Sequence, residues 1–166
     1  MAKDVKFSAL VGYFRNLAMK HTQIRHSDSE KHFYRFEVDE VLSGINGIIY
    51  PAMIMEGYRF SFTDQKSDNP VKKREGAFIL IDHVSDPGDY EKIHQVWDTM
   101  EEIGDDILAK IKADKRDPSS PVRDFDIESV SGQLVATEMG NHYGIRYTFT
   151  VDCRFSWDVN PDKWME

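Results

Sequence analysis

The chain has 166 residues, 40% of them hydrophobic and 30% charged, which is the composition of a folded globular protein. This length suits one domain with a sizeable core, so we expect a single domain over residues 1–166. The formal net charge of −8 opposes binding to a polyphosphate, and no sequence-specific nucleic-acid partner is expected. Because no apolar run is long enough for a membrane span and the N-terminus lacks a signal-peptide pattern, we expect a cytoplasmic protein without a membrane partner.

A first helix is predicted over about residues 4–20, with Asp4 as its N-cap. Its apolar residues recur at spacings of three and four: Phe7, Leu10, Val11, Phe14, Leu17 and Ala18. The polar stretch that follows reads as a loop and contains His21, His26 and His32. The gaps between these histidines place no two of them on one helical turn and no cysteine lies nearby, so a metal site is not expected.

A short second helix is predicted around residues 38–47, and a long hairpin over residues 58–84. Tyr58, Phe60 and Phe62 alternate with polar residues in the first arm of the hairpin. The segment from Lys66 to Glu75 is rich in turn-forming and charged residues, so it reads as a polar tip. This interpretation places a basic cluster at the tip, consisting of Lys72, Lys73 and Arg74.

The clearest helix is predicted from about Asp89 to Ala113, because apolar residues follow one face of it throughout. The opposite side is strongly acidic and includes Asp98, Glu101, Glu102 and Asp105. Such a surface is either a solvated helix face or a face that meets a partner. A further hypothesis is an adaptor or inhibitor that uses this acidic face to mimic nucleic acid. Such a protein would bind a basic partner tightly, and the binding would weaken with added salt.

Two strands are predicted after the long helix, the first over residues 125–137 with a bend or bulge at Gly132. The second begins at Ile145 and alternates strictly to Trp157, with Cys153 on its apolar side as a small buried hydrophobe. Between them, "GNHYG" reads as a turn with His142 at its tip and Gly144 at positive φ. With no nucleophile beside His142, the turn is favoured over a catalytic loop.

These elements predict an α+β fold: a mixed or antiparallel sheet of about four to five strands, with the N-terminal helix and the long helix on one face. No Walker loop, GxGxxG, HExxH, GxSxG or CxxC motif is present. We therefore expect no enzyme, no catalytic residues, no cofactor and no metal. The rival hypothesis is an enzyme or small-ligand binding protein whose site forms around the start of the long helix, from His83, Asp86 and His94.

Three patterns carry a family resemblance: "VDEVLSGINGIIYPAMIMEG", "DYEKIHQVWDTMEEIGDDILAKIKAD" and "GNHYGIRYTFTVDCRF". Together with the order of elements, they resemble the tail terminator and minor tail proteins of long-tailed bacteriophages and prophages. The resemblance implies a virion structural protein that forms a ring, often hexameric, caps the tail tube and meets head-completion proteins. Such a protein would lie in the bacterial cytoplasm before assembly and in the virion tail afterwards.

Within that reading, we expect the acidic helix face of one subunit to meet the basic hairpin tip of the next. The tip would otherwise be a solvated loop. The segment "DVNPDKWME" departs from the family pattern and contains Trp164. It would either fold back on the sheet or reach a neighbouring subunit.

Overall fold

The computed structural model describes residues 6–35, 47–63, 70–137 and 140–165. Within these ranges the chain forms two α-helices, six strands and a short 3-10 turn, in the order α1 (Phe7–Lys20), β1 (Phe33–Arg35), β2 (Ala52–Met55), β3 (Arg59–Thr63), β4 (Val71–His83), α3 (Tyr90–Asp114), β5 (Phe125–Thr137), β6 (His142–Arg154) and η1 (Pro161–Lys163).

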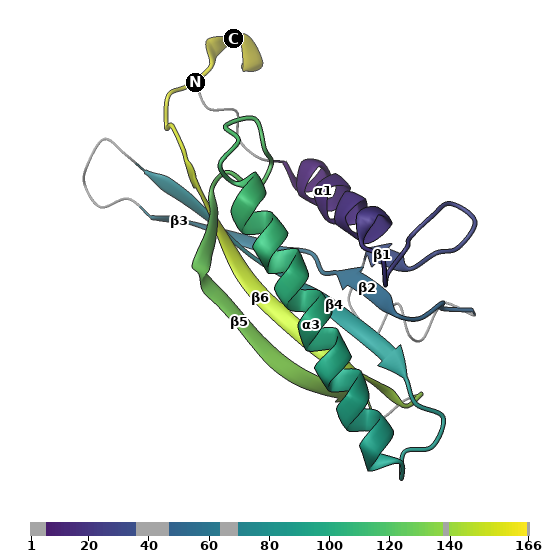
Figure 1. The fold of residues 1–166 in the computed structure, drawn as a ribbon. Helices are drawn as coiled ribbons and strands as arrows, with labels where there is room; N and C mark the ends of the chain where they lie inside the picture. Colours follow the sequence, from purple (N-terminus) through teal and green to yellow (C-terminus); the bar gives the residue numbers. More distant parts are fainter. Residues whose placement is uncertain (1–5, 36–46, 64–69, 138–139, 166) are drawn as a thin grey trace.

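The six strands form one mixed sheet in the order β1-β2-β4-β6-β5, with β3 also paired to β4. Both α1 and α3 lie over the same face of this sheet (Figure 1). The predicted α+β class, with both helices on one face, is therefore confirmed. The sheet exceeds the expected four to five strands because of β1, which pairs in parallel with β2. Three residues are too few to show a strand period in the sequence.

Two short strands in succession cover one side of β4. β2 pairs with residues 78–81 of β4 and β3 pairs with residues 71–75. Between β2 and β3 the chain stays beside β4, because the backbone N–H of Glu56 donates to the carbonyl of Ala77 at 3.0 Å. The predicted hairpin is thus present, and its first arm is interrupted where β2 gives way to β3.

The main core lies between the helices and the sheet. Alternate residues of β6 point toward the helices, and in the centre the Phe14 ring of α1 stacks on Phe149 with centroids 5.5 Å apart. Cys153 is buried on this face, as predicted. A second, smaller cluster occupies the opposite face and consists of Tyr34, Ala52, Ile54, Ile79 and Ile81.

The helix predictions hold best for α3, whose N-cap Asp89 accepts a hydrogen bond from the backbone N–H of Lys92 at 3.0 Å. α1 begins later than predicted, at Phe7, and its N-cap is Lys6 without a side-chain bond. Asp4 and nearly all of the predicted second helix lie outside the described residues. At the end of that segment, Gly47 has a φ of +90°.

The predicted polar tip is wrong for residues 71–75. Lys72, Lys73 and Arg74 lie within β4, which is paired on both sides at these positions. Arg74 is only 1% exposed, and its guanidinium lies 5.6 Å from the centre of the Tyr58 ring. Charged residues extend the strand here because β3 and β6 supply hydrogen bonds to the backbone, whatever the side chains are.

The final hairpin also differs from its prediction. The turn has positive φ at Gly140 and Asn141, whereas Gly144 is not among the positive-φ residues and lies within β6. His142 is buried and pairs with His83 and Thr137 on the neighbouring strands instead of occupying a loop tip. The register shift in β5 falls between Asp126 and Ser131, ahead of the predicted position at Gly132.

Candidate functional site

An aromatic cluster lies at the end of the sheet where β3 and β6 finish. We call it the aromatic end, and it consists of Phe60, Phe62, Phe155 and Trp157. The Phe62 ring centroid lies 4.8 Å from that of Phe155 and 5.2 Å from that of Trp157. Phe60 is 55% exposed and Trp157 is 57% exposed. The side chains therefore pack on one another while leaving much of their apolar surface open to solvent.

Lys72 of the predicted basic cluster belongs to this aromatic end. Its ammonium lies 4.4 Å from the centre of the Phe60 ring and 5.7 Å from that of Phe62. A cation held over aromatic faces at these distances is attracted by the ring quadrupoles. Lys73 points to the other face of the sheet, opposite Asp152. The three basic residues therefore do not form one cationic surface.

The chain continues beyond β6 through residues 155–165, which project from the body (Figure 1). We call this stretch the arm. It is attached at its start, where the Phe155 N–H donates to the carbonyl of Pro70 at 2.9 Å. Trp164 is 74% exposed, so it reaches out from the domain and does not fold back on the sheet. Of the two positions expected for Trp164, against the sheet or toward a neighbouring subunit, the second is the one compatible with this exposure.

The predicted acidic surface is present on α3. Asp98, Glu101, Glu102 and Asp105 are all exposed. Burial, and to a smaller extent the carboxylates of Asp105 and Glu101, raise the pKa of Tyr147 beneath the helix to about 12. No ion pair within the described ranges joins these four carboxylates to Lys72, Lys73 or Arg74.

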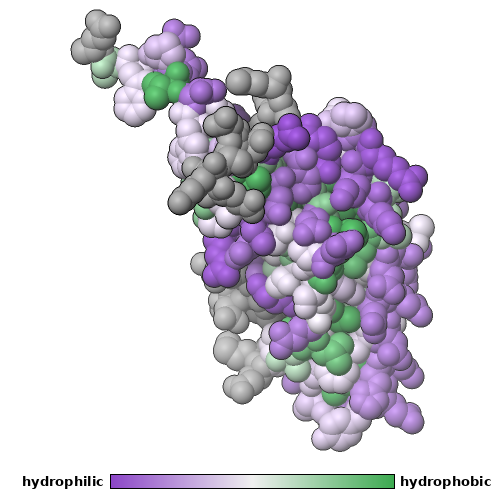
Figure 2. Space-filling model, turned by 90° about the vertical axis from the view of Figure 1, so that its left-hand side faces the viewer, coloured by the Kyte–Doolittle hydropathy of each residue, from purple (hydrophilic) through white to green (hydrophobic). Residues whose placement is uncertain are grey.

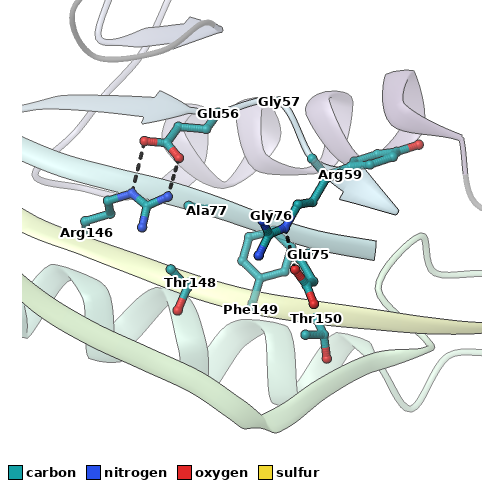
Figure 3. A pocket seen from close by; sticks show the side chains of 11 residues that line it. Glu56, Gly57, Arg59, Glu75, Gly76, Ala77, Arg146, Thr148, Phe149 and Thr150 are labelled. Atoms are coloured by element: carbon teal, nitrogen blue, oxygen red, sulfur yellow. Dashed lines mark hydrogen bonds and ion pairs between the residues drawn. The ribbon is translucent and has the colours of Figure 1, made fainter. Parts of the chain in front are cut away.

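A groove of about 750 Å³ lies where β2 gives way to β3 (Figure 3). Two ion pairs flank it. Arg146 forms a two-pronged pair with Glu56, at 3.1 and 2.6 Å, and Arg59 contacts Glu75 at 2.6 Å. Hydrogen bonding to Glu56 raises the pKa of Arg146. Each guanidinium of the groove is paired with a carboxylate, so the charges of these four lining residues balance.

A polar cluster around the buried His142 lies on the same face of the sheet as this groove, at the other end of the sheet. The Tyr50 hydroxyl is hydrogen-bonded to Nε2 of His142, and Thr137 Oγ1 lies 3.3 Å from Nδ1 of the same ring. The His83 ring packs edge-on against His142, at 5.6 Å between centroids. Burial is the main cause of a raised pKa at Tyr50. Sequence reasoning missed this cluster because its members come from three distant segments.

The contacts of His142 give it a structural role, contrary to its predicted position at a solvated tip. We expect His142→Ala to lower the free energy of unfolding by about 1 kcal/mol, because the hydrogen bond between the half-buried Tyr50 hydroxyl and the buried His142 ring would be lost. Chemical denaturation of this variant, of Tyr50→Phe and of the double variant measures the coupling. If the two single effects simply add, the hydrogen bond does not contribute to stability.

The three residues of the rival site around the start of α3 each contact other groups. His83 packs against Tyr50 and His142, whereas His94 stacks on Trp97 at 5.9 Å. Asp86 accepts a hydrogen bond from the backbone of Gly88. The three residues thus have separate partners. The histidines of the first loop have structural contacts too, since His32 donates its N–H to Nδ1 of His26.

Comparison with models of protein families and with curated proteins found no match. Within the described ranges there is no group of three or more His, Cys, Asp or Glu side chains that could hold a metal ion. None of the helices described above is long and apolar enough to cross a bilayer.

Proposed function

We propose that this chain is a self-associating structural subunit of a phage or prophage tail, of the tail terminator or tail completion type. It would assemble head to tail into a closed ring, and the ring would dock between the tail tube and the head-completion proteins. Before assembly the subunit would reside in the bacterial cytoplasm. The observation that supports this proposal best is the aromatic end together with the arm.

Exposed aromatic surface of this kind is unusual for a protein that acts alone. Single apolar side chains on a surface are ordinary, whereas contiguous exposed apolar patches mark sites of protein contact. Phe62 contacts both Phe60 and Trp157, and all three remain exposed. The arm adds Val159 and Trp164 beyond them. Tryptophan and other aromatics also supply much of the binding energy in protein interfaces.

The alternatives have less support from the same geometry. The groove between β2 and β3 is lined by mutually neutralised ion pairs, and the residues of the rival site have separate partners. A head-to-tail contact of identical subunits closes into a ring when the rotation between neighbours divides a full turn. An interface built on aromatic side chains would also explain association between chains that each carry a net charge of −8.

The proposal predicts a closed assembly. Light scattering behind size-exclusion chromatography should give a mass that rises with concentration and levels off at one multiple of the chain mass. Negative-stain electron microscopy of that peak should show rings. Because the contact is apolar, added salt should not dissociate it, in contrast to an electrostatic interface. A monomer at all accessible concentrations, or unlimited growth into filaments, would contradict the proposal.

Replacing aromatic residues of the patch tests where the contact lies. We expect Phe60→Ser with Phe62→Ser to shift the assembly toward monomers by at least tenfold in concentration, with a native circular dichroism spectrum. Tyr90→Ser is the matched control, since Tyr90 is an exposed aromatic residue on α3, away from the patch. Equal behaviour of the two variants would show that the aromatic end is not an interface.

A further inference from the structure

The outer side of β5 is an open sheet edge. β5 lies at the end of the strand order and, among the described strands, pairs only with β6. Its regular part, Ser131–Thr137, has the sequence SGQLVAT, without a charged residue or a proline. Leu134 in the middle is 53% exposed. Figure 2 views the molecule from this side and shows apolar side chains gathered next to a hydrophilic strip.

Such an edge is uncommon in a protein that remains alone in solution. Natural edge strands are usually blunted by lysine, by proline, by a bulge or by a covering segment, because their free N–H and C=O groups accept another strand. In β5 the irregularity lies between Asp126 and Ser131 and leaves the following seven-residue stretch regular. One carbonyl of this stretch, that of Val135, accepts a hydrogen bond from Nε1 of Trp97 at 3.3 Å. The rest of the edge from Ser131 onward is therefore able to accept an added strand.

The arm has the complementary property. The alternation that places Tyr147 to Cys153 on the helix side of β6 continues past the end of the strand, through Phe155, Trp157 and Val159. No strand is formed by the arm, although this pattern favours one. Trp157 and Val159 are both more than half exposed. The arm is a strand-like sequence without a sheet to join in its own subunit.

We propose that the arm of one subunit adds as an extra strand to the edge of β5, along Ser131–Thr137, in a second copy of this chain. The inference rests on the proposed self-association and specifies its interface. Backbone hydrogen bonds would provide affinity, and the alternate side chains Trp157 and Val159 would cover the apolar surface around Leu134.

The register of the sheet places the start of the arm at the opposite end of β5 from Thr137. Phe125 at the start of β5 pairs with Val151, near the point where the arm leaves β6, whereas Thr137 at the far end pairs with His142. The arm continues away from the Ser131–Thr137 stretch, past the end of the sheet (Figure 1). An arm from a neighbouring subunit can reach this edge without reversing its direction.

The surface available is sufficient for association. An aromatic side chain offers on the order of 150–250 Å², so the exposed parts of Trp157, Trp164 and Val159 together give roughly 400 Å². Phe60 and Phe62 at the base of the arm add roughly 200 Å² on the same scale. With equal area from the receiving subunit the total reaches roughly 1,200 Å², the lower limit of specific interfaces. In a ring, each subunit would form two such contacts.

Two full-length variants separate donor from acceptor. The arm variant, Trp157→Asp with Val159→Asp, keeps the edge of β5 and removes the apolar side chains of the arm. The edge variant, Leu134→Lys with Ala136→Lys, keeps the arm and places two charges beside the edge. Its control, Tyr90→Lys with Gln95→Lys, adds the same charge at exposed positions of α3. Circular dichroism and thermal melting verify that each variant is folded.

We expect each variant to be monomeric by light scattering at concentrations where the wild type and the control assemble. When the two variants are mixed, the intact arm of the edge variant can bind the intact β5 edge of the arm variant. No other productive contact remains, so the mixture should form a one-to-one heterodimer that grows no further. A mixture that remains monomeric would overturn the proposal. An arm variant that assembles by itself would also overturn it, since edges would then pair with each other, while the proposed self-association would stand. A monomeric wild type would instead contradict both.

Discussion

Gly144→Ala is expected to lower the free energy of unfolding by about 3–5 kcal/mol, which is at the upper end for a single substitution. A Cβ on Gly144 would lie 1.9 Å from the carbonyl oxygen of Leu80 and 2.8 Å from the Cα of Ile81. Both atoms belong to the backbone of β4, which pairs with β6 along its whole length. Since a backbone within the sheet cannot rotate away, the strands would have to separate locally.

The effect is measured by urea denaturation, with Gly12→Ala as the control. A Cβ at Gly12 meets nothing within 4 Å, and its position in α1 favours alanine by up to about 1 kcal/mol. From the sequence alone, Gly144 is predicted to serve a turn with positive φ, where Gly144→Val would cost about 1–3 kcal/mol. In the structure, steric overlap with β4 is the reason for glycine at this position. A loss of less than about 1 kcal/mol in the free energy of unfolding of Gly144→Ala would refute the overlap with β4.

Gly104→Ala is expected to have the second largest effect, a net loss of about 2 kcal/mol. The new Cβ would lie 2.0 Å from the hydroxyl oxygen of Tyr147, which packs beneath α3 from β6. The Tyr147 ring is itself stacked on Phe78 at 4.9 Å between centroids, so it has little room to move. Overpacking of this kind costs about 1–3 kcal/mol or more, and the gain in helix propensity offsets only part of it.

Tyr147→Phe provides the matched measurement, because the Tyr147 hydroxyl is buried without a hydrogen-bond partner among the described residues. Removing it should leave stability unchanged or raise it slightly. In the double variant the closest clash disappears, while the ring carbons Cζ and Cε2 would still lie 2.3 and 2.6 Å from the new Cβ. Gly104→Ala should therefore cost somewhat less beside phenylalanine than beside tyrosine. If the two substitutions prove additive in thermal denaturation, the Tyr147 hydroxyl does not contribute to the cost.

Much of the fold follows from local periodicity. The apolar stripe and the terminal residues of α3 predict its bounds within one residue, and strict alternation predicts β6 and the burial of Cys153. A helix or a strand with one buried face leaves its period in the sequence because every turn or pair of residues repeats the same environment. The α+β class follows from the order of these elements. The sequence is compatible with two positions of Trp164, and the structure has the exposed one.

Only the tertiary structure determines which distant strands supply the hydrogen-bond partners of a given stretch of backbone. Charged residues at 72–74 read as a loop, but β3 and β6 on either side make them part of a strand, and Arg74 is buried as a result. In the same way, His142 becomes a buried partner of Tyr50, and Gly144 is required by the close approach of β4. The open edge of β5 is visible only in the strand order. Each of these features depends on which distant segment lies alongside, and the local sequence does not encode its own neighbours.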